Sequence, residues 1–394
     1  MSELKDVFII SAKRTPVGAF QGALSSIAAH KLGATAIKAV LDETKVDPAT
    51  IDEVIMGNVL SAGQGQAPAR QAALGADLPD SVECLTINKM CGSGLKAVML
   101  GAQAIQIGDA EIVIAGGMEN MTQAPYLLPK GREGHRLGHG QVIDSMIKDG
   151  LWDAYNDKHM GNCAEMCASE KNYSREDQDA FAKTSYTRAL SAQESGAFSD
   201  EIVSVSIPQR KGDPILVDTD EEPNRANFEK MKSLRPAFEK EGTITAANAS
   251  KINDGAAAIM IMSGDKAKEL GLTPLATIGA QASAAHAPEW FTTAPSKAIS
   301  KVLDKAGLTA EDIDLWEINE AFAPVTMAAR DDFNLNHDKV NINGGAIAIG
   351  HPIGGSGARI LTTLIHAMIS KNVNTGLATL CIGGGEASAL IISR

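Results

Sequence analysis

The sequence predicts an α/β fold made of two similar halves with an insertion between them. Three observations lead to this prediction. Short apolar segments alternate with amphipathic helical segments in residues 7–120 and again in residues 275–394, which is typical of a parallel sheet covered by helices. Parts of the first region recur in the second in the same order. The segment between the two regions differs in composition, because it is rich in glycine, histidine and charge.

The repeat rests on three matched pairs of segments. They are residues 36–42 with 298–304, residues 91–94 with 354–357, and residues 115–119 with 382–386, at offsets of 262, 263 and 267 (298 − 36, 354 − 91 and 382 − 115). Each match alone could arise by chance. Their common order and nearly constant offset predict a duplicated unit.

The alternating pattern also places the individual elements. The expected strands lie at residues 7–10, 83–87, 256–262, 316–318 and 377–382, and the expected helices at residues 95–105, 175–195 and 358–368. We therefore expect a first half over residues 1–120 that is completed by a strand within residues 250–270. An inserted loop domain over residues 121–249 and a second half over residues 271–394 make up the rest.

Composition narrows the classes of function. The chain has 394 residues, 44% of them hydrophobic and 21% charged, with a net charge of −12. This negative charge disfavours nucleic acid and anionic membranes as partners. Five cysteines, an odd number, do not indicate a disulfide framework, so we expect free thiols and a cytoplasmic location. Cys163 and Cys167 are four residues apart without a second ligand pair, so no metal site is predicted.

Cys91 is the most informative residue. It lies in the sequence Asn-Lys-Met-Cys-Gly-Ser-Gly, between the strand at 83–87 and the helix at 95–105. A thiol at this turn faces unpaired backbone N–H groups and the positive end of the helix dipole. Both features lower a thiol's pKa, so we expect a reactive thiolate. The alternative is a buried structural cysteine.

Three further polar groups stand at the ends of predicted strands or at the start of a helix. His351 lies in the glycine-dense residues 343–357, Cys381 ends an apolar strand before three glycines, and Asn319 follows the strand at 316–318. Open α/β sheets build their sites at the carboxyl ends of strands. The sequence therefore predicts that these residues and Cys91 form one site.

Together these motifs resemble those of the thiolase family over essentially the whole chain, from residues 11–18 to residues 381–385. The Asn-Glu-Ala-Phe, Gly-His-Pro and Cys-x-Gly-Gly-Gly elements occur here in the family's order. The resemblance implies two βαβαβαββ halves that form a five-layered α-β-α-β-α core, with an inserted loop domain. Cys-Gly-Ser-Gly after Lys-Met resembles the biosynthetic members more than the degradative ones, which carry Cys-Ser-Ser-Gly.

The resemblance also implies an activity. It is the reversible Claisen condensation of two acetyl-CoA to acetoacetyl-CoA and CoA, through an acetyl group on Cys91 and without a cofactor. One alternative is a degradative 3-ketoacyl-CoA thiolase with a broad range of chain lengths. Another is a non-catalytic acyl-CoA-binding protein, which the intact set of site residues disfavours.

Family resemblance assigns the roles within the site. Cys91 is the nucleophile, His351 takes its proton, and Cys381 is the base for the second acetyl-CoA. His351 and a water held by Asn319 meet the enolate oxygen. Backbone N–H groups of Cys91 and Gly383 bind the tetrahedral oxyanion.

For coenzyme A, the resemblance implies that His159 and Met160 meet the pantetheine end, that Ser250 contacts the pantetheine amides and that Arg225 meets the nucleotide. The alternatives are that His159 caps a helix and that Ser250 fills a turn. Residues 131–154 resemble a loop that pairs dimers, which implies a homotetramer. Residues 286–295 resemble those of members that respond to potassium, so potassium activation stays open.

Overall fold

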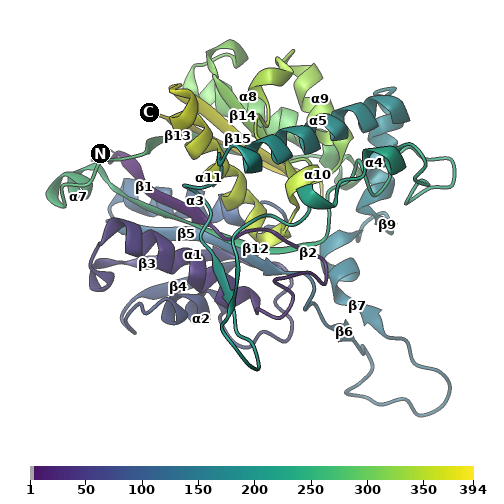
Figure 1. The fold of residues 1–394 in the computed structure, drawn as a ribbon, viewed down its shortest axis with the longest axis horizontal. Coiled ribbons are helices and arrows are strands. Elements are labelled where there is room, and N and C mark those ends of the chain that lie inside the picture. Colours follow the sequence, from purple (N-terminus) through teal and green to yellow (C-terminus); the bar gives the residue numbers. More distant parts are fainter. Residues whose placement is uncertain (1–3) are drawn as a thin grey trace.

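The computed structural model describes residues 4–394, so the first three residues of the expected N-terminal half lie outside the described part (Figure 1). The strands of both halves join in one ten-stranded sheet, in the order β14-β15-β16-β13-β1-β12-β5-β3-β4, with β2 paired to β12.

The first half runs from the N-terminus to β5 and is completed by a strand that follows the insertion. Its elements are β1 (Val7–Arg14), β2 (Gly18–Ala19), α1 (Ala29–Thr44), β3 (Glu53–Gly57), α2 (Pro68–Gly75), β4 (Glu83–Ile87), α3 (Ser93–Ile107), β5 (Ile112–Asn120) and β12 (Asn253–Ser263). β12 pairs antiparallel with both β1 and β5, whereas β3 runs parallel to β4 and β5.

The second half repeats this order after α7 (Gly264–Glu269). Its elements are β13 (Ala276–Ala285), α8 (Ala294–Ala306), β14 (Leu315–Ile318), α9 (Ala323–Asp332), α10 (Ala346–Ile349), α11 (Ile353–Lys371), β15 (Thr375–Ile382) and β16 (Glu386–Ser393). At the position that corresponds to β4, the second half has a parallel bridge between Val340 and Trp316. The duplication expected from the sequence is therefore visible in the strand order.

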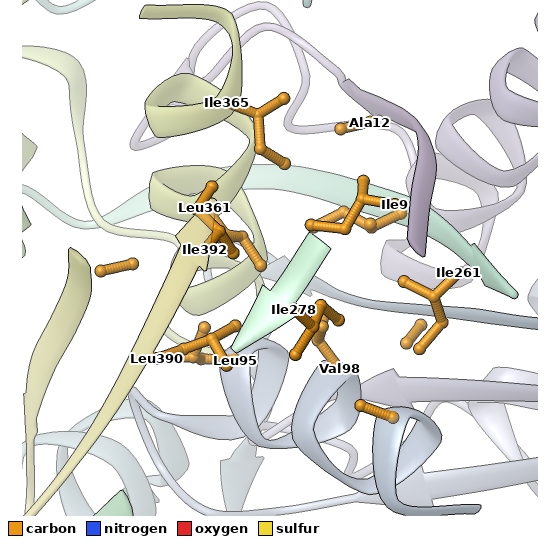
Figure 2. Close-up of a cluster of buried hydrophobic side chains, with 14 of the residues drawn as sticks. Ile9, Ala12, Leu95, Val98, Ile261, Ile278, Leu361, Ile365, Leu390 and Ile392 are labelled. Carbon is orange, nitrogen blue, oxygen red and sulfur yellow. The ribbon is translucent and has the colours of Figure 1, made fainter. Parts of the chain in front are cut away.

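The helices form three layers around the two halves of the sheet. α1 and α2 cover one side, α8 and α9 cover the other, and α3 and α11 lie in the middle (Figure 1). Figure 2 shows Leu95 of α3 beside Leu390, Val98 of α3 beside Ile278, and Leu361 of α11 beside Ile392, all within one cluster. Apolar side chains from both halves thus share one central core, and the five-layered α/β fold is confirmed.

The insertion between β5 and β12 contains small elements. These are β6 (Tyr126–Leu127), β7 (Ile143–Asp144), a π-helix (Met146–Leu151), β8 (Trp152–Asp153), β9 (Lys158–His159), α4 (Met160–Glu170), α5 (Arg175–Glu194), β10 (Val205–Ile207), β11 (Ile215–Val217), a 3₁₀ turn (Pro223–Arg225) and α6 (Phe228–Met231). The loop between β6 and β7 projects away from the body of the molecule (Figure 1). Within residues 4–394, no helix combines the length and apolar character needed to cross a membrane.

The expected start of the helix after His351 was wrong. α11 begins at Ile353, five residues before the predicted start at residue 358, because the glycines of this segment lie inside the helix. A Cβ on Gly357 would lie 2.3 Å from the backbone nitrogen of Leu95 in α3. The glycines therefore allow α11 to lie against α3 at a distance that side chains would prevent.

Candidate active site

The two central helices begin side by side. A Cβ on Gly94, in the first turn of α3, would lie 2.7 Å from the nitrogen of Ala358 and 3.2 Å from the carbonyl oxygen of Gly354 in α11. Cys91 precedes α3, and Ile353, which begins α11, packs in the same apolar cluster as Cys91. The segments that carry Cys91 and His351 therefore meet at one end of the central layer.

A strained turn presents Cys91. Met90, the residue before it, has φ of 47°, in the left-handed region that costs a residue with a side chain about 1 kcal/mol or more. Ser93 holds this turn, because its hydroxyl donates to the carbonyl of Met90 (2.7 Å) and accepts from the backbone N–H of Lys89 (2.8 Å). The strain is thus maintained at the residue next to the proposed nucleophile.

The expectation of a resting thiolate at Cys91 was wrong. The backbone N–H groups of Gly383 and of Cys91 itself donate to the sulfur and lower its pKa, but the loss of water on burial outweighs them and raises the pKa to about 11. The reason is that the two N–H dipoles offset only part of the free energy lost when a thiolate is removed from water. Cys91 is therefore a neutral thiol at rest and requires a base.

His351 has a free ring nitrogen for that purpose. The ring nitrogen Nδ1 lies 2.6 Å from the hydroxyl of Ser356, and that hydroxyl donates its single proton to the carbonyl of Pro352 (2.9 Å). Nδ1 must then carry the ring proton and donate it to Ser356. Nε2 is left with a lone pair, and it is buried without a hydrogen-bond partner among the described residues.

His351 is also uncharged. Burial and the nearby charge of Arg359 lower the pKa of His351 to about 3. Its backbone N–H donates to Oδ1 of Asn253 (2.8 Å), which fixes the main chain at this position. A neutral imidazole with a free Nε2 can accept a proton from a thiol, whereas an imidazolium could not.

Cys381 lies close enough to Cys91 for the charge of one sulfur to act on the other. It occupies the end of β15, is fully buried, and packs in an apolar cluster with Met160, Phe291 and Phe322. Burial and the proximity of Cys91 both raise the pKa of Cys381 well above its ordinary value. Two thiols that are far apart in the sequence therefore share one site, and both are protonated at rest.

Gly383 lies at the edge of the same site. A Cβ on Gly383 would lie 3.6 Å from the sulfur of Met160 and 3.9 Å from the terminal carbon of Met90. Its N–H points at the sulfur of Cys91. Gly383 therefore lies close to Cys91, Met90 and Met160.

An ion pair joins the two cysteine-bearing loops. Glu386 follows the triple glycine after Cys381. In the structure its carboxylate pairs with the ammonium of Lys89, two residues before Cys91. The pair is partly exposed, so we attribute to it loop alignment more than stability.

Asn319 presents an unused amide. It follows β14, which runs parallel to β15, and its backbone N–H donates to the carbonyl of Thr379 (3.0 Å). The side chain is buried, and neither amide atom has a hydrogen-bond partner among the described residues. Buried amides are rarely left without partners, so this group is suited to holding a water or a substrate oxygen.

Three supporting residues escaped the sequence analysis as functional groups, namely Ser356, Asn253 and Glu119. The carboxylate of Glu119 accepts from the backbone N–H of Gly354 at the start of α11 (2.9 Å) and from those of Val59 (3.0 Å) and Leu60 (3.1 Å). Ser356 lay in a repeated glycine-rich motif, which was its one signal. The contacts of Asn253 and Glu119 span distant parts of the chain and cannot be read from spacing.

The proposed coenzyme contacts lie in different settings. Nδ1 of His159 accepts from the backbone N–H of Gly161 (3.0 Å), so His159 caps α4, which was its alternative interpretation. Its ring stacks on Phe238 with centroids 4.8 Å apart. Ser250 is partly exposed and donates its backbone N–H to the carbonyl of Ala321 (3.0 Å). Arg225 lies on the surface with its side chain 53% exposed, 3.7 Å from Glu221.

Residues 4–394 contain no group of three or more histidine, cysteine or acidic side chains arranged to hold a metal ion. The chemistry that the site offers is that of two neutral thiols, a neutral imidazole and backbone N–H donors. This combination suits covalent catalysis on an acyl group.

Comparison with known proteins shows which family the chain resembles. Residues 7–265 match the family model described as thiolase, N-terminal domain, and residues 272–394 match the one described as thiolase, C-terminal domain. The chain is 53% identical to an acetyl-CoA acetyltransferase of Pseudomonas aeruginosa and 55% identical to one of Cupriavidus necator. Each comparison covers 99% of this chain and 100% of the relative.

Solved structures agree with the fold. One is the Acat5 thiolase of Ascaris suum in complex with coenzyme A, which is 44% identical with a TM-score of 0.94 and covers 99% of this chain and 100% of its own. Another is the acetyl-CoA acetyltransferase of Bacillus anthracis, which is 41% identical with a TM-score of 0.97 over 100% of both chains.

Proposed function

The chain belongs to the thiolase family of acyltransferases, and from that premise we propose that it condenses two acetyl-CoA molecules reversibly into acetoacetyl-CoA and CoA. Relatives named acetyl-CoA acetyltransferase share more than half of their residues with it over their whole length. The observation that carries the proposal is the pairing of Cys91 with Cys381 beside the N–H of Gly383.

The first half-reaction acetylates Cys91. The sulfur of Cys91 attacks the carbonyl carbon of acetyl-CoA while its proton passes to Nε2 of His351, which forms a tetrahedral oxyanion. The N–H groups of Cys91 and Gly383, which meet the sulfur at rest, stabilise that oxyanion. When the bond to CoA breaks, neutral Cys381 gives its proton to the departing sulfur and becomes a thiolate.

The second half-reaction forms the carbon–carbon bond. The thiolate of Cys381 takes a proton from the methyl carbon of the second acetyl-CoA. The resulting enolate oxygen is met by protonated His351 and by a water on Asn319. The carbanion attacks the acetyl carbonyl, the bond to Cys91 breaks, and Cys91 recovers its proton from His351. All three groups are then neutral again, as they are in the resting structure.

The alternative is degradative thiolysis of long 3-ketoacyl-CoA substrates. Phe291 and Phe322 pack at Cys381, with their ring centroids 6.3 Å apart, and we propose that they restrict the acyl group to short chains. The test is a comparison of kcat/KM for acetoacetyl-CoA and 3-ketohexadecanoyl-CoA under thiolysis. We expect a preference of about 100-fold or more for the short substrate. Comparable values would establish the degradative alternative.

The proposed coenzyme site lies in the inserted residues 121–249 and the segment that follows. We propose that Met160 and Ser250 flank the pantetheine arm, that Arg225 meets a phosphate of the nucleotide, and that His159 contributes its ring edge while capping α4. Exposure of the Arg225 side chain supports its availability for an anion. Arg225→Gln should raise KM for acetyl-CoA with little change in kcat.

We further propose a cytoplasmic homotetramer. The five cysteines are free, which suits a reducing compartment. The projecting loop between β6 and β7 exposes Leu128, Leu137 and Val142, and exposed apolar side chains on such a loop favour contact with another subunit. Light scattering after size-exclusion chromatography would test this, with Leu137→Asp expected to reduce the mass of the particle.

A further inference from the structure

The ammonium group of Lys251 lies among oxygen atoms from distant segments. Nζ donates to the carbonyl of Ala249 (2.7 Å) and to the carbonyl of Ile347 (3.3 Å). It also stands 5.5 Å from the ring centroid of Tyr186 on α5, a position in which the aromatic face attracts a cation. None of these contacts is used by the mechanism described above.

Two carboxylates face this ammonium from other elements. Glu222 precedes the 3₁₀ turn Pro223–Arg225, and Glu320 follows β14. Both raise the pKa of Lys251, but burial has the larger effect and lowers it to about 8. The charged form is therefore the main one at neutral pH, surrounded by two carbonyl oxygens, two carboxylates and an aromatic ring. Arg225 is the other cation close to Glu222.

Ile347 connects Lys251 to the proposed base. Its carbonyl accepts from Lys251 and its N–H donates to Oε2 of Glu320 (3.2 Å). It lies in α10, which ends at Ile349; Gly350 follows with φ of 119°, and His351 is the next residue. The N–H of His351 is held in turn by Asn253, two residues after Lys251. Residues 251–253 thus bind the segment 347–351 at two points, Lys251 at Ile347 and Asn253 at His351.

We propose that Lys251 is a built-in cation that positions His351 and the segment of Ser250 for the reaction. This role rests on the proposed function, in which His351 accepts the proton of Cys91. The ammonium supplies the positive centre between α10 and residues 249–251. Without it, the carbonyls of Ala249 and Ile347 lose their common donor, and α10 loses the hydrogen bond that ties it to residues 249–251.

The oxygen-rich surroundings suggest a direct test by chemical rescue. Lys251→Ala removes the ammonium but leaves its partners, and oxygen donors of this kind bind hard cations. Ammonium chloride and potassium chloride are the probes, with choline chloride at the same ionic strength as the reference. The matched control is Lys305→Ala, because Lys305 also donates to a main-chain carbonyl, that of Gln281 (2.9 Å), on the exposed side of the second half.

We expect Lys251→Ala to lower kcat for condensation by about 10- to 100-fold, with KM changed much less. Ammonium at about 100 mM should restore a large part of kcat in this variant alone. The proposal would be overturned if Lys251→Ala kept the wild-type kcat in choline buffer. It would also be overturned if ammonium raised the kcat of Lys251→Ala no more than that of Lys305→Ala.

A second variant covers the case in which Lys251→Ala does not fold. Lys251→Met keeps the volume and leaves no room for an ion, so it should lose kcat without rescue. The ratio of wild-type to variant kcat should approach one as the pH rises above about 8, because Lys251 then loses its charge. A ratio of one at pH 7 would refute the role. Acetylation of Cys91 by the unaltered chain is measured first, since its absence would overturn the proposed function itself.

Discussion

At the scale of single residues, the two thiols and the imidazole of the site are uncharged at rest. Burial keeps the pKa of Cys91 at about 11 and that of His351 at about 3, and it keeps Cys381 protonated. In the proposed mechanism, charges arise at these groups only when a substrate carbonyl is present to accept the negative charge. This arrangement protects both thiols from reaction with other electrophiles, because the thiolate is the reactive form.

Ser356 sets which nitrogen of His351 is free, so Ser356→Ala should lower kcat. Without the hydroxyl, Nδ1 loses its partner at 2.6 Å and the ring can exchange its proton between nitrogens. We expect kcat to fall by about 10- to 100-fold with KM for acetyl-CoA little changed. Steady-state kinetics would measure this. Ser283→Ala, which removes a hydroxyl paired with Ser388 (3.1 Å), serves as the control, and equal kcat values for both variants would refute the tautomer assignment.

At the scale of elements, α3 and α11 approach closely through glycines, and one buried carboxylate holds the start of α11. The carboxylate of Glu119 lies at the first turn of α11. It accepts hydrogen bonds from backbone N–H groups of that helix and of the loop after β3. Burial raises the pKa of Glu119 from 4.5 to about 7. The residue that ties the start of α11 to the loop after β3 therefore makes this contact sensitive to pH.

Glu119 should make the protein less stable as pH rises from about 4.5 to about 7. The folded state holds the proton of this carboxyl more tightly than the unfolded state, so stability is greatest below the unfolded pKa and is lost toward the folded pKa. The contribution is on the order of 3 kcal/mol. Denaturant unfolding of the wild type and of Glu119→Gln at both ends of this range would measure it. A constant difference between the two proteins would contradict the assignment.

Sequence patterns located the elements better than they located the ends of these helices. The repeat predicted a duplicated unit, and α5 lies where residues 175–195 were expected. The expectation of a parallel sheet was only partly right, because β12 and β16 run antiparallel to their neighbours. α11 starts early because glycines normally counted against a helix are needed here for contact with α3. That requirement comes from a partner helix far along the chain, so local propensity does not contain it.

At the scale of the whole molecule, the two halves share one core. The central cluster takes side chains from α3, α11 and strands of both halves, including Ile9 and Ile392 (Figure 2). β1 and β13 also pair directly, with Phe8 opposite Thr277 and Ile9 opposite Ala276. Neither half could bury its inner face without the other.

We therefore expect one calorimetric unfolding transition for both halves. Leu361 is fully buried in the central layer. Leu361→Ala should lower the free energy of unfolding by about 2–5 kcal/mol and lower the temperature of that single transition without splitting it. Leu303→Ala in the outer layer of the second half should do the same, which makes it the matched comparison. Two separate transitions in either variant would show that the halves unfold independently.

Chemical motifs placed Cys91, His351, Asn319 and Cys381 at one end of the fold, and the structure gives them compatible surroundings. The protonation state of Cys91 could not be predicted, because it depends on burial by segments hundreds of residues away. The same applies to the carbonyls around Lys251 and to the ion pair of Lys89 with Glu386. Spacing along the chain predicts local turns, whereas the balance between burial and dipoles depends on tertiary contacts.

The division of labour between the two sulfurs is tested most directly by mass spectrometry of the protein after mixing with acetyl-CoA. In Cys381→Ser we predict an acetyl group on Cys91 and no acetoacetyl-CoA in the same reaction, whereas Cys91→Ser should gain no acetyl group. Condensation by Cys381→Ser at a rate near that of the wild type, or an acetyl group carried by a residue other than Cys91, would contradict the account.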